Sequence, residues 1–253
     1  MNGTWRGFTI IETMLVLAIT GLVVAVVLVN IGTALRNEQY HTAVDQVHDY
    51  FQGQYSLTSA ILNDRSSTNT CSSGGVKLDD NGSGRATSNC FILGRVLRAE
   101  VYTDLSGAKH QRINSFPAIA RRDVADPIQF PNEDQKPAKQ VFADASIVMG
   151  DQVSSYDLAG ESDVKLKTPT GDVNTFALTM LIARSPISGR VHTYYTSNTQ
   201  AVINVNSMVE ADLKLCVDPA GIINMGISPM GILIEKGAAN ASAVRMLGSG
   251  ECV

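Results

Sequence analysis

An uncharged and mostly apolar run from Thr13 to Leu35 constrains this chain more than any other feature of its sequence. A helix rises by about 1.5 Å per residue, so roughly 20 residues suffice to cross the hydrocarbon core of a membrane. No proline interrupts the run, and no second run of this kind follows it. The sequence therefore predicts a single membrane-spanning helix near the N-terminus.

The position of the small residue relative to this run distinguishes a leader that is cleaved after its apolar core from one that is cleaved before it. A secretory signal peptide has a basic start, an apolar core of roughly 7 to 15 residues and a small-residue cleavage site after that core. Here the apolar run is longer, and the small residue Gly7 precedes it, at the end of the polar stretch MNGTWRG. A peptidase that cut after Gly7 would leave the apolar helix attached to the mature protein.

The residues RGFTIIETMLVLAITG resemble the class III signal of type IV pilins and type II secretion pseudopilins. In that family a short leader ends in glycine, here Gly7, and phenylalanine begins the mature chain, here Phe8. A glutamate then follows as the fifth mature residue, here Glu12. The resemblance implies that a prepilin peptidase cleaves between Gly7 and Phe8 and methylates the new amine of Phe8. It also implies that Glu12 meets the terminal amine of a neighbouring subunit in a filament core.

The charge of Glu12 gives a physical reason to expect such a partner. A carboxylate in a membrane-spanning segment costs roughly 2.5 to 3.5 kcal/mol on insertion scales, and such residues usually mark function. A nearby ammonium group would offset this cost. The alternative is that Glu12 interacts with the N-terminal end of the helix dipole and reaches the membrane interface.

The stretch after the apolar run has an amphipathic helical pattern. The apolar run and this amphipathic stretch together predict one helix from about Phe8 to about Asn63, on the order of 80 Å long. The resemblance implies that its second half packs on a sheet. His41, Asp45 and His48 share one face, which predicts a solvated polar surface rather than a metal site. The apolar stripe consists of Tyr40, Val44, Val47, Phe51, Tyr55 and Leu62, with Thr58 at the one missing step.

The four cysteines, Cys71, Cys90, Cys216 and Cys252, lack the spacing of a zinc or redox motif. They are better explained as disulfides formed in an oxidising compartment. Three pairings are open, of which the local ones, Cys71 with Cys90 and Cys216 with Cys252, are favoured. Such loops would stabilise the fold by roughly 3 and roughly 4 kcal/mol in the chain-entropy account.

The polar segment between the helix and Cys90 predicts an exposed loop or hairpin. Within it Asp79, Asn81 and Ser83 match the opening of an EF-hand calcium loop. The twelfth position of that loop requires a bidentate glutamate, but Cys90 stands there. A turn is therefore expected in preference to a calcium site, and the sequence predicts no metal and no cofactor.

The rest of the chain is rich in strand patterns. A strand is predicted over 91–103, a long insertion over 105–140, and two antiparallel hairpins over 176–196 and 212–227. The C-terminal AVRMLGSGECV is predicted to add an edge strand pinned by Cys252. These units loosely resemble the heads of minor pilins and pseudopilins of the GspH and FimT kind.

The predicted fold is α+β, with a long N-terminal helix packed on an antiparallel sheet. Its parts are a leader (1–7), a transmembrane or filament-core helix (8–35), an amphipathic helix (36–63) and a β-rich head with long loops (64–253). The formal net charge is −4 and the basic residues are scattered, so no nucleic-acid partner is expected. No catalytic motif is present, so no enzyme activity is expected.

The resemblance implies a structural subunit of a type IV pilus-like filament, with roles in adhesion, motility or surface attachment. A mature chain of 246 residues, seven fewer than the full 253, favours a minor or tip pilin. Its partners would be prepilin peptidase, other pilin subunits, inner-membrane assembly machinery and, before assembly, the lipid bilayer. The head would lie outside the cytoplasm, first on the inner membrane and then on an extracellular filament. A major subunit is left open within the same role. Two further alternatives remain: a type II secretion pseudopilin, and a single-span extracellular binding protein that does not assemble.

Overall fold

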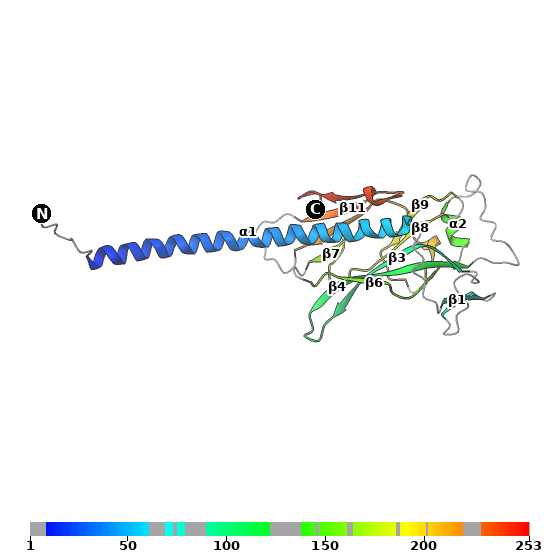
Figure 1. Cartoon of the computed structure of the whole chain (residues 1–253), viewed down its shortest axis with the longest axis horizontal. Helices are drawn as coiled ribbons and strands as arrows, with labels where there is room; N and C mark the ends of the chain where they lie inside the picture. Colours follow the sequence, from blue (N-terminus) through cyan, green and yellow to red (C-terminus); the bar gives the residue numbers. More distant parts are fainter. Residues whose placement is uncertain are drawn as a thin grey trace.

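The structure is a computed structural model that describes residues 9–60, 69–72, 75–78, 90–121, 138–144, 147–160, 164–185, 188–200, 202–219 and 229–252. One long helix extends from a head built of antiparallel sheets (Figure 1). The predicted α+β class, with the helix packed on a sheet head, is confirmed.

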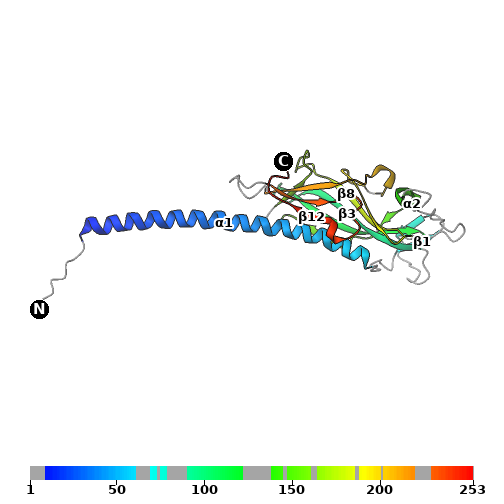
Figure 2. The same ribbon diagram turned by 90° about the horizontal axis from the view of Figure 1, so that it is seen from above.

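Helix α1 (Ile10–Ser59) is continuous over 50 residues. At about 1.5 Å per residue its length is about 75 Å. Its N-terminal half projects away from the head, and its C-terminal half lies along it (Figure 2). The uninterrupted helix follows from the sequence, because neither half contains a proline.

The larger sheet is built around a long hairpin of β3 (Cys90–Thr103) and β4 (Lys109–Arg121). The two strands pair from Cys90 opposite Arg121 to Thr103 opposite Lys109. The sheet has six strands in the order β5-β4-β3-β8-β9, and β6 also pairs with β4. The other members are β5 (Val148–Met149), β6 (Ser154–Asp157), β8 (Leu178–Arg184) and β9 (Val191–Thr196).

The smaller sheet has four antiparallel strands in the order β12-β11-β10-β7. A separate pair joins β1 (Asn69–Ser72) to β2 (Gly75–Leu78). The four strands are β7 (Lys165–Lys167), β10 (Leu213–Asp218), β11 (Met230–Ile234) and β12 (Val244–Leu247). Short helices are α2 (Ala138–Asp144), η1 (Val205–Ser207) and η2 (Ala241–Ala243).

The C-terminal half of α1 packs against both sheets. Its buried residues share one core with Leu97 and Met180 of the larger sheet and with Leu215 and Ile232 of the smaller one. A second core lies on the larger sheet and includes Phe142 of α2. The buried stripe of α1 comprises Tyr40, Val44, Val47, Phe51, Tyr55 and Thr58, as predicted, and Leu62 lies outside the described residues.

Most of the predicted strands are found. The strand over 91–103 is part of β3, the hairpin over 176–196 is β8 and β9, and β12 is an edge strand followed by a disulfide at Cys252. The second hairpin differs from its prediction. Strand β10 forms as expected and pairs with β11 at Met230–Ile234, beyond the predicted run. The predicted second strand, 221–227, lies outside the described residues.

The predicted insertion over 105–140 is wrong for its first part, because Lys109–Arg121 forms β4, and α2 begins at Ala138. Strand β4 is buried along most of its length and carries polar residues inside. The Ser115 hydroxyl donates to Gln54 on α1, and the Asn114 amide donates to Glu100 on β3. Because both faces of β4 are partly covered, no alternation of polar and apolar residues marks it.

A glycine allows the two central strands of the larger sheet to approach closely. The β3–β4 register shifts between Ile92 and Gly94, and Gly94 lies opposite Ala183 on β8. A Cβ at position 94 would collide with the backbone carbonyl of Ile182. The close approach of β3 to β8 beside this bulge therefore requires a residue without a side chain.

Candidate functional site

The N-terminal half of α1 is the largest apolar surface that the structure describes. Its large aliphatic side chains are exposed from Ile10 to Leu35, and none of the side chains described in this stretch is buried in the head. The stretch is long and apolar enough to cross a membrane. Soluble proteins rarely expose an apolar surface of this extent, so it needs lipid or protein around it.

Glu12 lies in the first turn of this surface and forms a capping box with Thr9. The Glu12 backbone N–H donates to the Thr9 hydroxyl over 3.3 Å, and the Thr9 backbone N–H donates to the Glu12 carboxylate over 3.4 Å. The pattern Thr-x-x-Glu is a sequence signal for a helix start. Glu12 thus has a contact within its own chain, which the sequence analysis did not predict.

Two hydroxyls of the exposed half of α1 are hydrogen-bonded within the helix. Thr13 donates to the carbonyl of Ile10 over 2.9 Å, and Thr20 donates to the carbonyl of Val16 over 2.8 Å. Such bonds remove the need for an external partner in a lipid environment. The Glu12 carboxylate is the one acidic group between Thr9 and Leu35.

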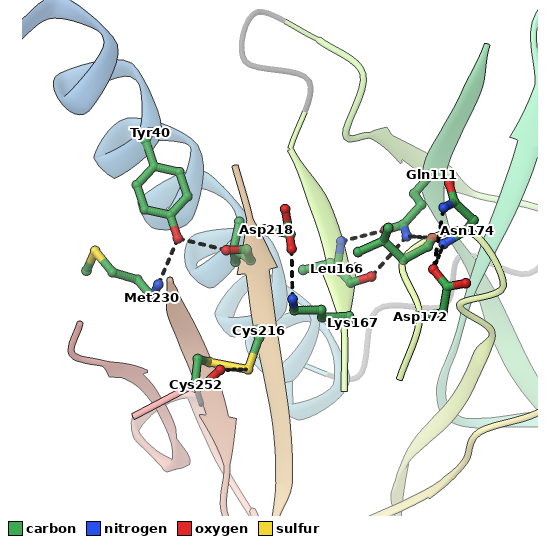
Figure 3. A network of polar contacts seen from close by, with 12 residues as sticks. Tyr40, Gln111, Leu166, Lys167, Asp172, Asn174, Cys216, Asp218, Met230 and Cys252 are labelled. Atoms are coloured by element: carbon green, nitrogen blue, oxygen red, sulfur yellow. Dashed lines mark hydrogen bonds and ion pairs between the residues drawn. A yellow bond between two sulfur atoms is a disulfide. The ribbon is translucent and has the colours of Figure 1, made fainter. Parts of the chain in front are cut away.

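The Tyr40 hydroxyl fastens α1 to the smaller sheet (Figure 3). It donates to the carbonyl of Val217 on β10 and accepts from the N–H of Met230 on β11, both over 2.7 Å. Burial raises the pKa of this hydroxyl. The contact lies where the exposed half of α1 ends, so it anchors the base of the projecting helix to the head.

Two further side chains fasten α1 to the larger sheet. The buried Tyr55 hydroxyl lies 2.8 Å from the Thr193 hydroxyl, which itself donates to the carbonyl of Ala238. Burial raises the pKa of Tyr55 to about 12. The Gln54 side chain accepts from Ser115 over 2.9 Å. The head and the C-terminal half of α1 are therefore joined by directional bonds as well as by apolar packing.

Gln111 of β4 links the two sheets through its side-chain amide (Figure 3). The amide accepts from the N–H of Leu166 over 2.6 Å and donates to the carbonyl of Leu166 over 2.9 Å. It also donates to the carbonyl of Val173. The side chain thus pairs with strand β7 as a neighbouring backbone would.

His48 departs from the predicted polar face of α1. His41 and Asp45 are exposed as expected, but His48 is half-buried, and its Nε2 lies 3.1 Å from the carbonyl of Val244 on β12. His48 is therefore a contact between helix and sheet. Among the described residues, no group of three His, Cys, Asp or Glu side chains could hold a metal ion.

Cys216 and Cys252 form a disulfide with a Cα–Cα distance of 5.6 Å (Figure 3). It joins β10 to the segment after β12 and passes over Gly231 of β11, where a Cβ would collide with the Cys252 sulfur. This pairing is the predicted one. The side chains of Cys71 and Cys90 lie outside the part of the chain that the structure describes.

Several other predicted site residues also lie outside the described residues. These are Gly7 and Phe8 of the processing motif and the calcium candidates Asp79, Asn81 and Ser83. Comparison of the chain with protein-family models, with curated proteins and with solved structures found no match.

Proposed function

We propose that this chain is a prepilin-like subunit that is cleaved after Gly7, methylated at Phe8 and assembled through the exposed half of α1 into a type IV pilus-like filament. A minor or tip pilin is the preferred role, with the head carrying a function in adhesion, motility or surface attachment. The single observation that carries the proposal is the apolar half of α1. It lies wholly outside the head, and its first turn carries the Glu12 of the signal motif.

The physical argument concerns what covers this surface in each state. Before assembly the bilayer covers the apolar half of α1 and the head lies beyond the membrane. In a filament the same half packs against the helices of neighbouring subunits, which replace the lipid. An amine supplied by a neighbouring Phe8 would then compensate the Glu12 charge.

The capping box gives specific support to the alternative of a single-span protein that never assembles. It provides Glu12 with a role at the helix start, where a carboxylate also favours the helix dipole. Under this alternative the negative charge has no partner outside the chain. A type II secretion pseudopilin remains the alternative within the same family. The two roles are separated by whether the neighbouring genes encode the secretin and ATPase of a type IV pilus or of a type II secretion system.

Two substitutions separate the filament role of Glu12 from its capping role. Glu12→Gln removes the charge and keeps a side-chain carbonyl for the cap, whereas Thr9→Ala removes the capping hydroxyl and keeps the charge. We expect Glu12→Gln to remain in the membrane and to be lost from sheared surface filaments. Thr9→Ala should assemble close to the wild-type level, since loss of a cap costs only about 1 kcal/mol.

The measurement is an immunoblot of membrane and sheared filament fractions from the native host. Normal assembly of Glu12→Gln would overturn the filament role of the charge. Loss of Thr9→Ala from filaments together with normal assembly of Glu12→Gln would show that the cap, and not the charge, is what matters.

A further inference from the structure

A cavity of about 520 Å³ lies at the end of the head that is remote from the exposed half of α1. Ser59, the last residue of α1, lines it, together with residues of the β8–β9 turn. Ser59 is 24 residues beyond Leu35, which corresponds to about 36 Å along the helix. The cavity is thus far from the proposed assembly surface, and its volume is typical of a site for a small molecule.

Two arginines give this cavity a positive character. Arg184 is half-buried, and its Nε donates to the carbonyl of Gly189 over 3.0 Å, which holds the guanidinium at the cavity wall. Arg190 is exposed, and its guanidinium has no ion-pair or hydrogen-bond partner among the described residues. A guanidinium has five N–H donors and stays charged, so both side chains retain donors for an anion.

One carboxylate faces these arginines. Glu210 is half-buried at the cavity, and its Oε1 lies 3.7 Å from Nδ1 of His192. His192 is itself positioned by stacking on Tyr194 and by an edge contact with Phe142. The lining therefore carries two fixed positive charges and one negative charge, whereas the whole chain carries a formal net charge of −4.

The geometry points to a site for a small sugar that bears a carboxylate or phosphate group. The arginines match a planar or tetrahedral oxyanion. The Glu210 carboxylate can accept from sugar hydroxyls, and the Ser59 hydroxyl, which donates within α1 to the carbonyl of Ser56, keeps a lone pair to accept another. This inference does not depend on the proposed function, because an anchored head that never assembles would have the same cavity.

Isothermal titration calorimetry of the full chain in nonionic detergent tests the site with matched ligands. Glucuronate and glucose 6-phosphate supply the two kinds of oxyanion, glucose is the neutral analogue, and acetate is the anion without the sugar. We expect saturable binding of at least one acidic sugar, at least about tenfold tighter than glucose or acetate. An acidic sugar that binds no more tightly than glucose would overturn the oxyanion part, and acetate binding equally well would overturn the sugar part.

Charge variants test whether binding occurs at this cavity. Arg190→Gln, on an exposed residue, should weaken binding of the acidic sugar by about tenfold. Glu210→Gln should tighten it, because it removes the one negative charge of the lining. Arg245→Gln, an exposed arginine on β12, is the control and should leave binding unchanged. Wild-type affinity in Arg190→Gln, or an equal loss in Arg245→Gln, would refute the site.

Discussion

Tyr55 shows how much a single side chain contributes to the contact between α1 and the head. Its hydroxyl is buried and bonded to Thr193, and burial raises its pKa to about 12. The phenolate is therefore disfavoured in the folded state relative to the unfolded chain, where the pKa is about 10. The contribution is complete below about pH 10 and is lost as the pH rises towards 12, by about 1.4 kcal/mol per pH unit.

We predict that Tyr55→Phe changes the alkaline stability profile. Below about pH 10 the variant should be less stable than the wild type by about 1 kcal/mol, because one hydrogen bond is lost. Between about pH 10 and 12 the difference should shrink and then reverse, since the wild type loses about 1.4 kcal/mol per pH unit and phenylalanine does not titrate. Denaturant unfolding at a series of pH values measures this, and a constant difference up to pH 12 would be inconsistent with a buried neutral phenol.

Substitution of Gly94 tests the close approach of β3 and β8, and substitution of Gly53 in α1 is the comparison. Gly94→Ala would place a Cβ against the carbonyl of Ile182, so we expect destabilisation of about 1 to 3 kcal/mol. Gly53 lies within α1 with open space around its Cα, so Gly53→Ala should stabilise by about 0.5 to 1 kcal/mol. Equilibrium unfolding compares both variants with the wild type, and a neutral Gly94→Ala would mean that β8 can move away.

Single residues also mark where sequence reasoning succeeds and fails. The spacing of Tyr40, Val44 and Phe51 was enough to predict the buried stripe, because helical periodicity is local. The two hydrogen bonds of Tyr40 to β10 and β11 join residues about 180 positions apart, so they cannot be predicted from a local pattern. The local pattern places His48 on a polar face. Its partner, the carbonyl of Val244, lies on the last strand, so the contact cannot be predicted from neighbouring residues.

At the scale of elements, the smaller sheet depends on a covalent link at its C-terminal end. The Cys216–Cys252 disulfide closes a sequence separation of 36 residues, which implies a contribution of roughly 4 kcal/mol in the chain-entropy account. We predict that replacing both cysteines by serine lowers the free energy of unfolding by about 2 to 4 kcal/mol.

The C-terminal segment should be the first part affected by that replacement. Hydrogen exchange of β12 should become faster than exchange of β3 and β4, which the disulfide does not touch. If the exchange rate of β12 in the variant equals that of the wild type, pairing with β11 is enough to keep β12 folded without the disulfide.

The elements that sequence analysis missed have a common physical cause. Strand β4 was assigned to an insertion because it carries Gln111, Asn114 and Ser115 inside the fold, where alternation is expected to place apolar residues. Gln111 bonds to β7, Asn114 accepts from Ser155 on β6, and Ser115 bonds to α1, so each partner is distant in the sequence. Strand β11 lies beyond the hairpin predicted over 212–227, and strand pairing depends on tertiary contacts more than on local sequence.

At the scale of the whole molecule, the two halves of α1 have opposite environments. The first half projects from the head and the second lies along it (Figure 1). The first half exposes aliphatic side chains along its length, while the second is held to both sheets by packing and by Tyr40, Gln54 and Tyr55. A head attached rigidly to an apolar helix suits a subunit whose helix is transferred from lipid to a filament core. The sequence predicts these two environments because the two halves of the helix differ in composition: the first is apolar all round and the second is amphipathic.

The central claim is that the chain is a processed filament subunit, and its most direct test is the N-terminus of the protein isolated from its own host. The only tryptophan, Trp5, belongs to the proposed leader. Intact-mass and N-terminal peptide analysis should therefore find a chain that begins at methylated Phe8 and contains no tryptophan. A mature chain that still begins at Met1 and retains Trp5 would contradict the account.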